Sequence, residues 1–218
     1  MTTQQTEPQH AGGTGGEATG LIGHQRGESR HGAISSPRSR AMIYLAEWQA
    51  NGLEAGKFFP ATESGLNDPF APSDQPNAVP PADGQVASAG KDFAALLDEP
   101  RTDWEKHRVV AGEAVTLSWT YHAPHKTRRW NYFLTRPDWD PAEKLTRAQF
   151  ATDAVQTILY PAQPYWEHDL VPPDPTVHTV KIPGTYRGYH VLLAVWEVAD
   201  TGNAFYQVID LDVVEAAE

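Results

Sequence analysis

The feature that most constrains the fold is a strand-like alternation of side chains in the second half of the chain. The segment EAVTLSWTYHA, residues 113–123, alternates large apolar with small polar residues. Its apolar positions are Val115, Leu117, Trp119 and Tyr121, and the polar positions between them are Thr116, Ser118 and Thr120. A period of two with one apolar face predicts a strand that is buried on one side.

Further strand-like segments follow at short intervals. They are RRWNYFLT (128–135), TVHTVKIP (176–183), GYHVLLAVWEV (188–198) and NAFYQVIDLDVV (203–214). The third of these is almost entirely apolar, which is typical of a central strand. The turn-forming residues 200–203 separate the last two, so we expect a hairpin there. Short strands joined by Pro- and Gly-rich turns predict an all-β fold, an antiparallel β-sandwich.

The first half of the chain is organised differently. Residues 1–30 are polar and Gly-rich and cannot bury enough apolar surface to fold, so we interpret them as a disordered N-terminal arm. Residues 41–60 predict only short helices, broken at Asn51-Gly52. Residues 61–90 are dense in Pro, Asp, Ser and Gly, a loop long enough to suggest a functional role. We therefore expect one folded domain over residues 31–218, with a long loop and short-helix insertion after its first strand.

Composition excludes several classes of partner and site. The formal net charge of −11 argues against binding to nucleic acid or to an anionic membrane surface. The chain has no cysteine, so disulfides and thiolate metal sites are absent. A transition-metal site would have to be built from imidazole, carboxylate or backbone nitrogen.

Two of the nine histidines have a suggestive context. His31 begins the folded region, immediately before Gly32, and His125 lies in a predicted turn between two strands. A turn at the rim of a sandwich can present a side chain on a rigid surface. No short ligand motif links the two histidines, and an ordinary exposed turn residue remains an alternative for His125.

Five segments, in order, resemble the lytic polysaccharide monooxygenases of auxiliary activity family ten, also called chitin-binding type-4 domains. They are HGAISSPRSR (31–40), LEAGKFFP (53–60), PPADGQVASAG (80–90), the stretch 123–150 and the stretch 188–213. The resemblance implies an immunoglobulin- or fibronectin III-like sandwich with a flat binding face. It also implies one copper ion per chain, held by a histidine brace.

The resemblance assigns the copper ligands and their surroundings. The N-terminal histidine of the mature chain, here His31, would bind copper through its terminal amine and its ring, and His125 would add the third nitrogen. Ala123 matches the small residue at one axial approach, and Phe205 the aromatic at the other. Glu54 matches a glutamate that positions the oxidant or moves a proton. The alternative for Phe205 is that it only packs in the core. The alternative for Glu54 is that it is a solvated carboxylate in a loop.

The resemblance also assigns the surface that contacts substrate. Trp48 matches an exposed aromatic that stacks on a sugar ring, with burial beneath the loop as the alternative. Asp200 and Thr201 match polar residues that bind the polymer, although turn formation would also explain them.

The implied activity is oxidative cleavage of an insoluble crystalline polysaccharide, chitin first and cellulose second. It requires an external electron donor and dioxygen or hydrogen peroxide. The alternative is a non-catalytic chitin-binding or adhesion module. We expect a secreted monomer, by an export route that the sequence does not identify. Because an amide nitrogen is a poor metal ligand, Arg30 would have to be removed before His31 could complete the brace, which makes residues 1–30 a candidate pro-segment.

Overall fold

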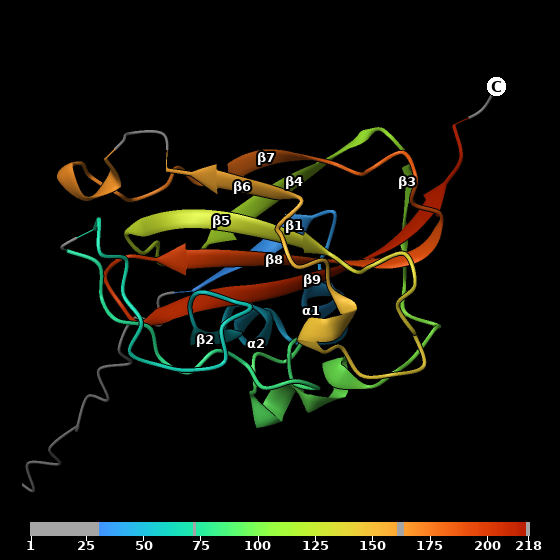
Figure 1. The fold of residues 1–218 in the computed structure, drawn as a ribbon, viewed down its shortest axis with the longest axis horizontal. Coiled ribbons are helices and arrows are strands. Elements are labelled where there is room, and N and C mark those ends of the chain that lie inside the picture. The colour runs from blue at the N-terminus through green and yellow to red at the C-terminus, as the bar shows by residue number, and fades with distance from the viewer. Residues whose placement is uncertain (1–30, 72, 161–163, 217–218) are drawn as a thin grey trace, which may run out of the picture.

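The protein folds as two packed β-sheets, seen in a computed structural model that describes residues 31–71, 73–160 and 164–216 (Figure 1). The smaller sheet has the strand order β1-β4-β7, and the larger has the order β2-β9-β8-β5-β6. The predicted disordered arm, residues 1–30, lies outside the described residues.

The smaller sheet contains β1 (Gly32–Ser36), β4 (Ala114–Tyr121) and β7 (Thr176–Lys181). The larger contains β2 (Glu54–Gly56), β5 (Thr127–Leu134), β6 (Gln156–Leu159), β8 (Gly188–Val198) and β9 (Asn203–Val214). The predicted β-sandwich is therefore confirmed. β8 is buried along most of its length between β9 and β5, as its apolar sequence indicated.

The antiparallel prediction needs one correction. The strand β3 (His107–Val110) pairs with β9 in parallel, while every other strand pair in the described residues is antiparallel. A parallel partner can be supplied by a segment far away in the chain, so no local turn signal marks it.

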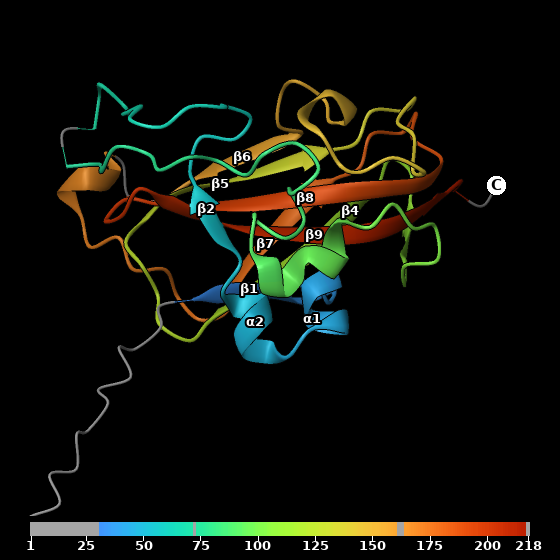
Figure 2. The same ribbon diagram turned by 90° about the horizontal axis from the view of Figure 1, so that it is seen from below.

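The insertion after β1 has the expected character. It contains the short helices α1 (Arg40–Tyr44) and α2 (Glu47–Asn51) and, after a long loop, the 3-10 helix η1 (Asp92–Asp98). Two further 3-10 turns, η2 (Arg147–Gln149) and η3 (Tyr165–Glu167), lie in later loops. α1, α2 and η1 gather along one side of the sandwich (Figure 2). No helix among the described residues is long and apolar enough to cross a membrane.

The core between the sheets explains the alternation in residues 113–123. Leu117 and Trp119 of β4 are fully buried. They belong to one apolar cluster with Trp196 and Tyr132 of the larger sheet. The polar residues between them face outward. A second apolar cluster lies on the other face of the larger sheet, under the insertion, and includes Phe59, Phe133 and Tyr206. The sheet is thus covered on both faces, which makes its strands a rigid support for the loops at its ends.

Candidate metal centre

Three loops that are far apart in sequence meet at one end of the sandwich, on the left in Figure 1. They are the start of β1, the connection from β4 to β5, and the turn from β8 to β9. The predicted hairpin is confirmed, although the turn covers residues 199–202 and Asn203 already belongs to β9. This end of the fold carries His31, His125 and Asp200.

His31 is fixed at the edge of the described fold. Its carbonyl oxygen accepts a hydrogen bond from the His122 backbone N–H at 2.9 Å, which continues the pairing of β1 with β4. Its ring lies edge-on to Phe205, with the ring centroids 6.1 Å apart. The next residue must be glycine, because a Cβ on Gly32 would lie 2.7 Å from the Tyr121 ring and 2.9 Å from the Trp196 ring. Close packing of aromatic rings therefore sets the position of His31.

The Nδ1 atom of His31 is buried and has no hydrogen-bond partner in the described part of the chain. Burial lowers the pKa of His31; Glu54 acts to raise it, and the nearby His125 acts to lower it. An imidazole that stays neutral keeps a lone pair on one ring nitrogen, as a metal ligand must. An unpartnered buried nitrogen is costly in a folded protein unless something binds it.

The His125 ring is held by a carboxylate. Its Nδ1 lies 3.0 Å from Oδ1 of Asp200, and the ring packs 5.7 Å from Phe205 and 6.0 Å from Trp196. Burial acts to raise the pKa of Asp200, but the His125 ring and backbone N–H groups outweigh it and bring that pKa below its usual value. The carboxylate accepts a hydrogen bond from Nδ1, and in the neutral ring this tautomer places the free lone pair on Nε2. Orientation of a ligating histidine by a carboxylate is common at metal sites.

The two histidines supply nitrogen donors of the kind that copper and zinc prefer. No group of three or more His, Asp or Glu side chains in residues 31–71, 73–160 and 164–216 is arranged to hold a metal ion. Two imidazoles need at least one more ligand, and the backbone nitrogen of His31 is the nearest group by covalent connection. The donor set therefore fits copper when that nitrogen is a free amine.

Glu54 and Phe205 are brought together by strand pairing, as members of β2 and β9 that face one another in the register. Phe205 is fully buried and stacks on Trp196 with ring centroids 4.8 Å apart. Oε2 of Glu54 lies 3.5 Å from Nδ2 of Asn203, at the limit of a hydrogen bond, and the carboxylate acts on the pKa of His31. Ala123 lies in the same short loop as His125, partly exposed.

The residues predicted to contact substrate lie on two different elements. Trp48 projects from α2 with 67% of its surface exposed and leans on Phe93, with ring centroids 5.9 Å apart. The Oγ1 atom of Thr201 accepts a hydrogen bond of 3.2 Å from the Asn203 backbone N–H, so this side chain does stabilise the turn. The Asp200 carboxylate bonds to backbone N–H groups as well, including its own, and in addition holds the His125 ring.

A further histidine beside the site was missed by the sequence reasoning. His122 lies in the same loop as His125, and its exposed ring is 3.3 Å from a carboxylate oxygen of Glu47 on α2. Its effect on the pKa of His31 places it close to that ring. Its position one residue after an alternating strand was a signal for a loop residue at the sandwich rim, next to the predicted ligand loop.

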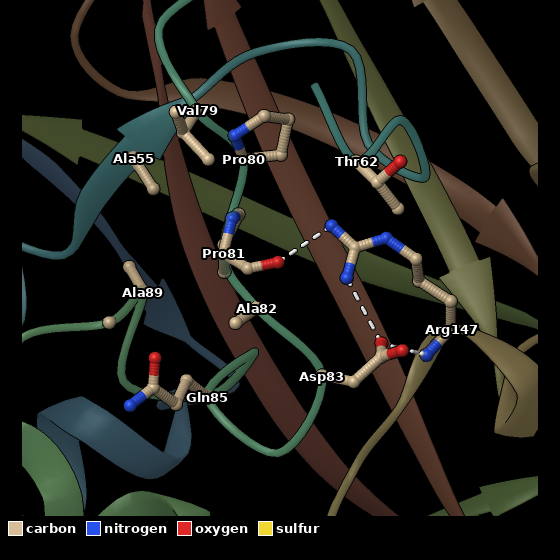
Figure 3. A pocket seen from close by; sticks show the side chains of 11 residues that line it. Ala55, Thr62, Val79, Pro80, Pro81, Ala82, Asp83, Gln85, Ala89 and Arg147 are labelled. Atoms are coloured by element: carbon tan, nitrogen blue, oxygen red, sulfur yellow. Dashed lines mark hydrogen bonds and ion pairs between the residues drawn. The ribbon is translucent and has the colours of Figure 1, made fainter. Parts of the chain in front are cut away.

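A cavity of about 530 Å³ lies on the flank of the larger sheet and does not include the two histidines (Figure 3). Arg147 occupies one wall and is already satisfied by Asp83 and by backbone oxygens of Pro60, Ala61 and Pro81. None of the predicted site residues lines this cavity; Glu54 comes nearest in sequence, because the next residue, Ala55, is part of the wall. This cavity is therefore separate from the histidine end of the sandwich.

A family described as "lytic polysaccharide mono-oxygenase, cellulose-degrading" matches residues 31–211. The chain belongs to this family, auxiliary activity family ten. The match begins at His31, the residue that the sequence predicted as the first of the folded domain.

Solved structures of the family are similar along most of the chain. A chitin binding domain from Burkholderia pseudomallei is 49% identical with a TM-score of 0.79, covering 85% of this chain and all of that one. A family-ten monooxygenase from Photorhabdus luminescens is 33% identical, with a TM-score of 0.70 and the same coverage. A Bacillus amyloliquefaciens relative in complex with Cu(I) is 31% identical, with a TM-score of 0.62, covering 84% of this chain and all of that one.

Curated relatives are longer than this chain. The GlcNAc-binding protein A of Shewanella oneidensis is 34% identical over 200 residues, which is 87% of this chain and 37% of the relative. The chain thus spans less than two fifths of that relative's length.

Proposed function

We propose that this chain is a copper-dependent monooxygenase that cleaves a crystalline polysaccharide oxidatively, with chitin as the favoured substrate and cellulose as the alternative. The observation that carries the proposal is the pair of ring nitrogens at one end of the sandwich. One is the buried, unpartnered Nδ1 of His31, and the other is the Nε2 of His125, which is left as an acceptor by the bond to Asp200. The copper-bound relative supports the choice of metal.

In this proposal, copper is held by the His31 ring, the His31 amine and the His125 ring. The bound ion supplies the activation of dioxygen or hydrogen peroxide with electrons from an external donor. The amine exists only after cleavage between Arg30 and His31, because an amide lone pair is delocalised into the peptide bond. The brace is therefore completed by processing, and residues 1–30 act as a pro-segment.

The neighbouring side chains shape the space around the brace. Phe205 covers one side with an apolar ring, which keeps water and additional ligands away from that side. Ala123 is small enough to leave room for a diatomic oxidant. The Glu54 carboxylate is within reach of Asn203 and close to His31, where it can orient the oxidant or hold a proton. Each of these roles is testable by substitution without touching the ligands.

The surface beside the brace is proposed to bind the polymer. Trp48 offers an exposed ring face for the C–H groups of a sugar, and Asp200 and Thr201 offer hydrogen bonds from the turn between β8 and β9. The names of the curated relatives, which refer to GlcNAc binding, favour chitin. The description of the family as cellulose-degrading keeps cellulose as the second substrate. A polymer outside the cell has to be met there, so we propose that the protein acts in the extracellular space as a monomer.

A non-catalytic chitin-binding module is the second candidate function. It is favoured by relatives named for binding rather than for oxidation. In this case the arm stays attached, and the histidine pair never gains its third nitrogen.

Copper binding separates the two candidates. Calorimetry and electron paramagnetic resonance would be measured on the full chain and on a form that begins at His31. We expect the shortened form to bind Cu(II) at least about 100-fold more tightly, since even outer partners of metal ligands contribute 10–100-fold. A His125→Ala variant of the shortened form should lose this gain, while the exposed His168→Ala variant should keep it. Equal and weak binding by both lengths would refute the monooxygenase proposal and leave the binding module.

Product analysis then tests the reaction. The copper-loaded shortened form, incubated with chitin and a reductant, should release oxidised oligosaccharides that are detectable by mass spectrometry. Hydrolysis products without added oxygen would contradict the proposed chemistry.

A further inference from the structure

Asp200 belongs to the metal centre and also forms one wall of a separate pocket of about 240 Å³. The residues that line this pocket are Ser73, Gln75, Lys126, His168, Leu170, Ala199 and Asp200. They come from four segments: the long loop after β2, the loop before β5, the segment after η3, and the turn between β8 and β9. Lys126 directly follows the proposed ligand His125, so the pocket adjoins the brace.

Backbone hydrogen bonds tie these four segments to one another. The Gln75 N–H donates to the Ala199 carbonyl at 3.2 Å, and the Ala199 N–H donates to the Lys126 carbonyl at 2.7 Å. The Thr127 N–H donates to the Leu170 carbonyl at 2.9 Å. Each wall is therefore bonded to the next through its main chain, and the pocket is fixed before any ligand arrives. Preorganised walls reduce the entropy that a ligand would otherwise have to overcome.

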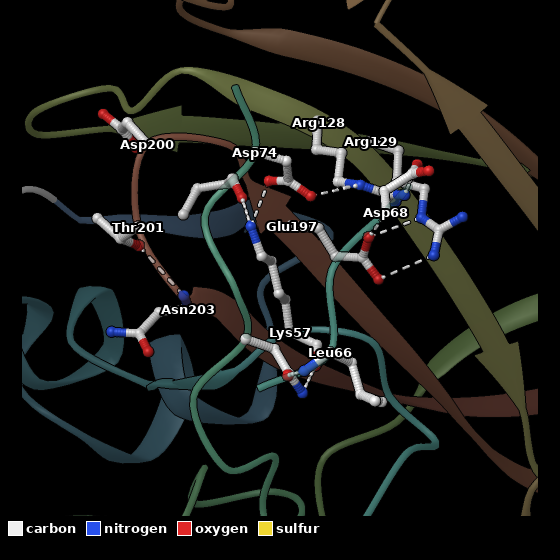
Figure 4. A network of polar contacts seen from close by, with 12 residues as sticks. Lys57, Leu66, Asp68, Asp74, Arg128, Arg129, Glu197, Asp200, Thr201 and Asn203 are labelled. Carbon is white, nitrogen blue, oxygen red and sulfur yellow. Dashed lines mark hydrogen bonds and ion pairs between the residues drawn. The ribbon is translucent and has the colours of Figure 1, made fainter. Parts of the chain in front are cut away.

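A buried network of charges anchors the long loop behind the pocket (Figure 4). The fully buried Lys57 donates from Nζ to Asp74 and to the Val198 carbonyl, the latter at 3.0 Å. Arg128 of β5 also bonds Asp74, at 3.2 Å, and bonds Glu197 of β8 at 2.9 Å. Asp74 lies between the lining residues Ser73 and Gln75, so this network holds their backbone against the sheet.

The side chains at the mouth of the pocket have no partners of their own. Within the part of the chain that the structure describes, Ser73, Gln75, Lys126 and His168 make no side-chain hydrogen bond or ion pair, and all four are exposed. They offer a hydroxyl, an amide, an ammonium and an imidazole. The buried Leu170 and Ala199 form an apolar floor beneath them. A few polar groups around an apolar surface are typical of a small-molecule site.

The volume limits what the pocket can hold. It corresponds to about eight water molecules at their share of liquid volume, which is below the range of sites for drug-sized ligands. One sugar ring, or the substituent of one ring, fits such a space, but a longer segment of polymer does not. Hydrogen-bond donors at the rim and an apolar floor match an acetamido group, which has a carbonyl oxygen and a methyl group.

We propose that this pocket is a subsite for the acetamido group of one N-acetylhexosamine unit, on the polymer that the neighbouring metal centre oxidises. The inference rests on the proposed function and adds a reason why the protein would bind chitin in preference to cellulose. Gln75 and Lys126 donate to the acetamido oxygen, and the methyl group lies over Leu170 and Ala199. Asp200 fixes the spacing between this group and the His125 ring, so binding here determines which bond of the polymer faces the brace.

Binding isotherms on insoluble polysaccharides test the subsite with the full chain, because binding does not require a complete brace. The pocket variant is Gln75→Ala/Lys126→Ala, which removes both proposed donors at two exposed positions whose loss should not affect folding. The matched control is Thr179→Ala/Lys181→Ala on the outer face of β7, where both side chains are also exposed. Each protein is measured with crystalline chitin and with crystalline cellulose, and its Cu(II) affinity is measured after shortening to His31.

The pocket variant is expected to bind chitin about tenfold more weakly, as removal of one or two hydrogen bonds predicts, with unchanged binding to cellulose. The control should bind both polymers like the original protein, and the Cu(II) affinity of every form should stay the same. Equal loss on chitin and cellulose would overturn the acetamido assignment. Unchanged chitin binding by the pocket variant would overturn the subsite and leave the proposed function standing. An original protein that binds neither polymer would overturn both.

Discussion

The buried ion pair between Arg40 and Asp210 should be one of the most sensitive points of the fold. Nε and Nη2 of Arg40 donate to the two carboxylate oxygens of Asp210 at 2.9 and 2.5 Å, and Nη1 donates to the Leu97 carbonyl at 2.7 Å. The guanidinium also lies 4.4 Å above the Trp104 ring. Only 3% of Arg40 and 2% of Asp210 is exposed. The pair joins α1 and η1 to β9 and so fastens the insertion to the larger sheet.

An Asp210→Asn substitution keeps the shape of the side chain but leaves a buried positive charge without its counterion. Loss of one partner of a buried pair costs about 3–5 kcal/mol. For a domain of this size that corresponds to a fall in melting temperature of roughly 6–20 °C. Urea denaturation at neutral pH would measure the free energy of unfolding directly. Asp210 is five residues along β9 from Phe205, about 17 Å, so the copper affinity of the shortened form should not change.

The exposed pair Arg136–Asp138 provides the matched control. It has the same two-point geometry, with distances of 3.0 and 2.6 Å, but its side chains are 49% and 68% exposed. Because water and salt screen an exposed pair, Asp138→Asn should leave the free energy of unfolding nearly unchanged. Equal costs for the two substitutions would refute the argument that burial, rather than geometry, gives the Arg40 pair its importance.

Three further predictions concern pH, backbone packing and the metal centre. Burial lowers the pKa of His178 to about 4, whereas in the unfolded chain it returns to about 6.5. Between pH 6.5 and pH 4 the unfolded chain binds a proton at His178 that the folded chain does not bind. The free energy of unfolding is therefore highest above pH 6.5 and falls by at most about 3 kcal/mol as the pH drops to 4. A His178→Gln variant with the same pH slope in urea titrations would contradict this. Gly56→Ala should cost more than about 4 kcal/mol or prevent folding, because the added Cβ would lie 1.8 Å from the Ala78 carbonyl oxygen. Gly65→Ala, in open space with φ of +84°, should cost only about 1–2 kcal/mol, and similar melting curves for the two variants would argue against the steric explanation. Asp200→Asn in the form beginning at His31 should weaken Cu(II) binding about 10–100-fold, and unchanged calorimetry would show that the bond to His125 does not orient the ligand.

The long strands could be predicted from the sequence because the pattern of apolar and polar side chains along them reflects which positions are buried. The alternation in residues 113–123 became β4, and the apolar run 188–198 became the central strand β8. The break at Gly52 did end α2. The short strands β2, β3 and β6 were missed, since segments of three or four residues carry too little periodicity to be recognised. The parallel pairing of β3 with β9 depends on chain segments about a hundred residues apart.

The candidate site was predictable only in part. No spacing rule connects His31 to His125, and their pairing came from the resemblance to a known family. The contact between Asp200 and His125 was not foreseen, because Asp200 was expected to bind the polymer or to stabilise the turn, and its sequence position gives no sign of the distant His125 ring. Lys57 is a lysine with no exposed surface, and its network was missed because charged side chains are rarely buried unless distant partners meet them. Sequence alone does not show those partners.

The pairing of β1 with β4 has a consequence for how the N-terminus can be made. Gly32 and Ala33 are already paired with Tyr121 and Thr120, and the His31 carbonyl is bonded to His122. A protease needs an extended, unpaired backbone, so the bonds after His31 are withheld from it while the sheet is intact. Under the proposed processing, trimming from the N-terminal side would therefore halt where the pairing of β1 begins, and the residue left at the N-terminus would be His31.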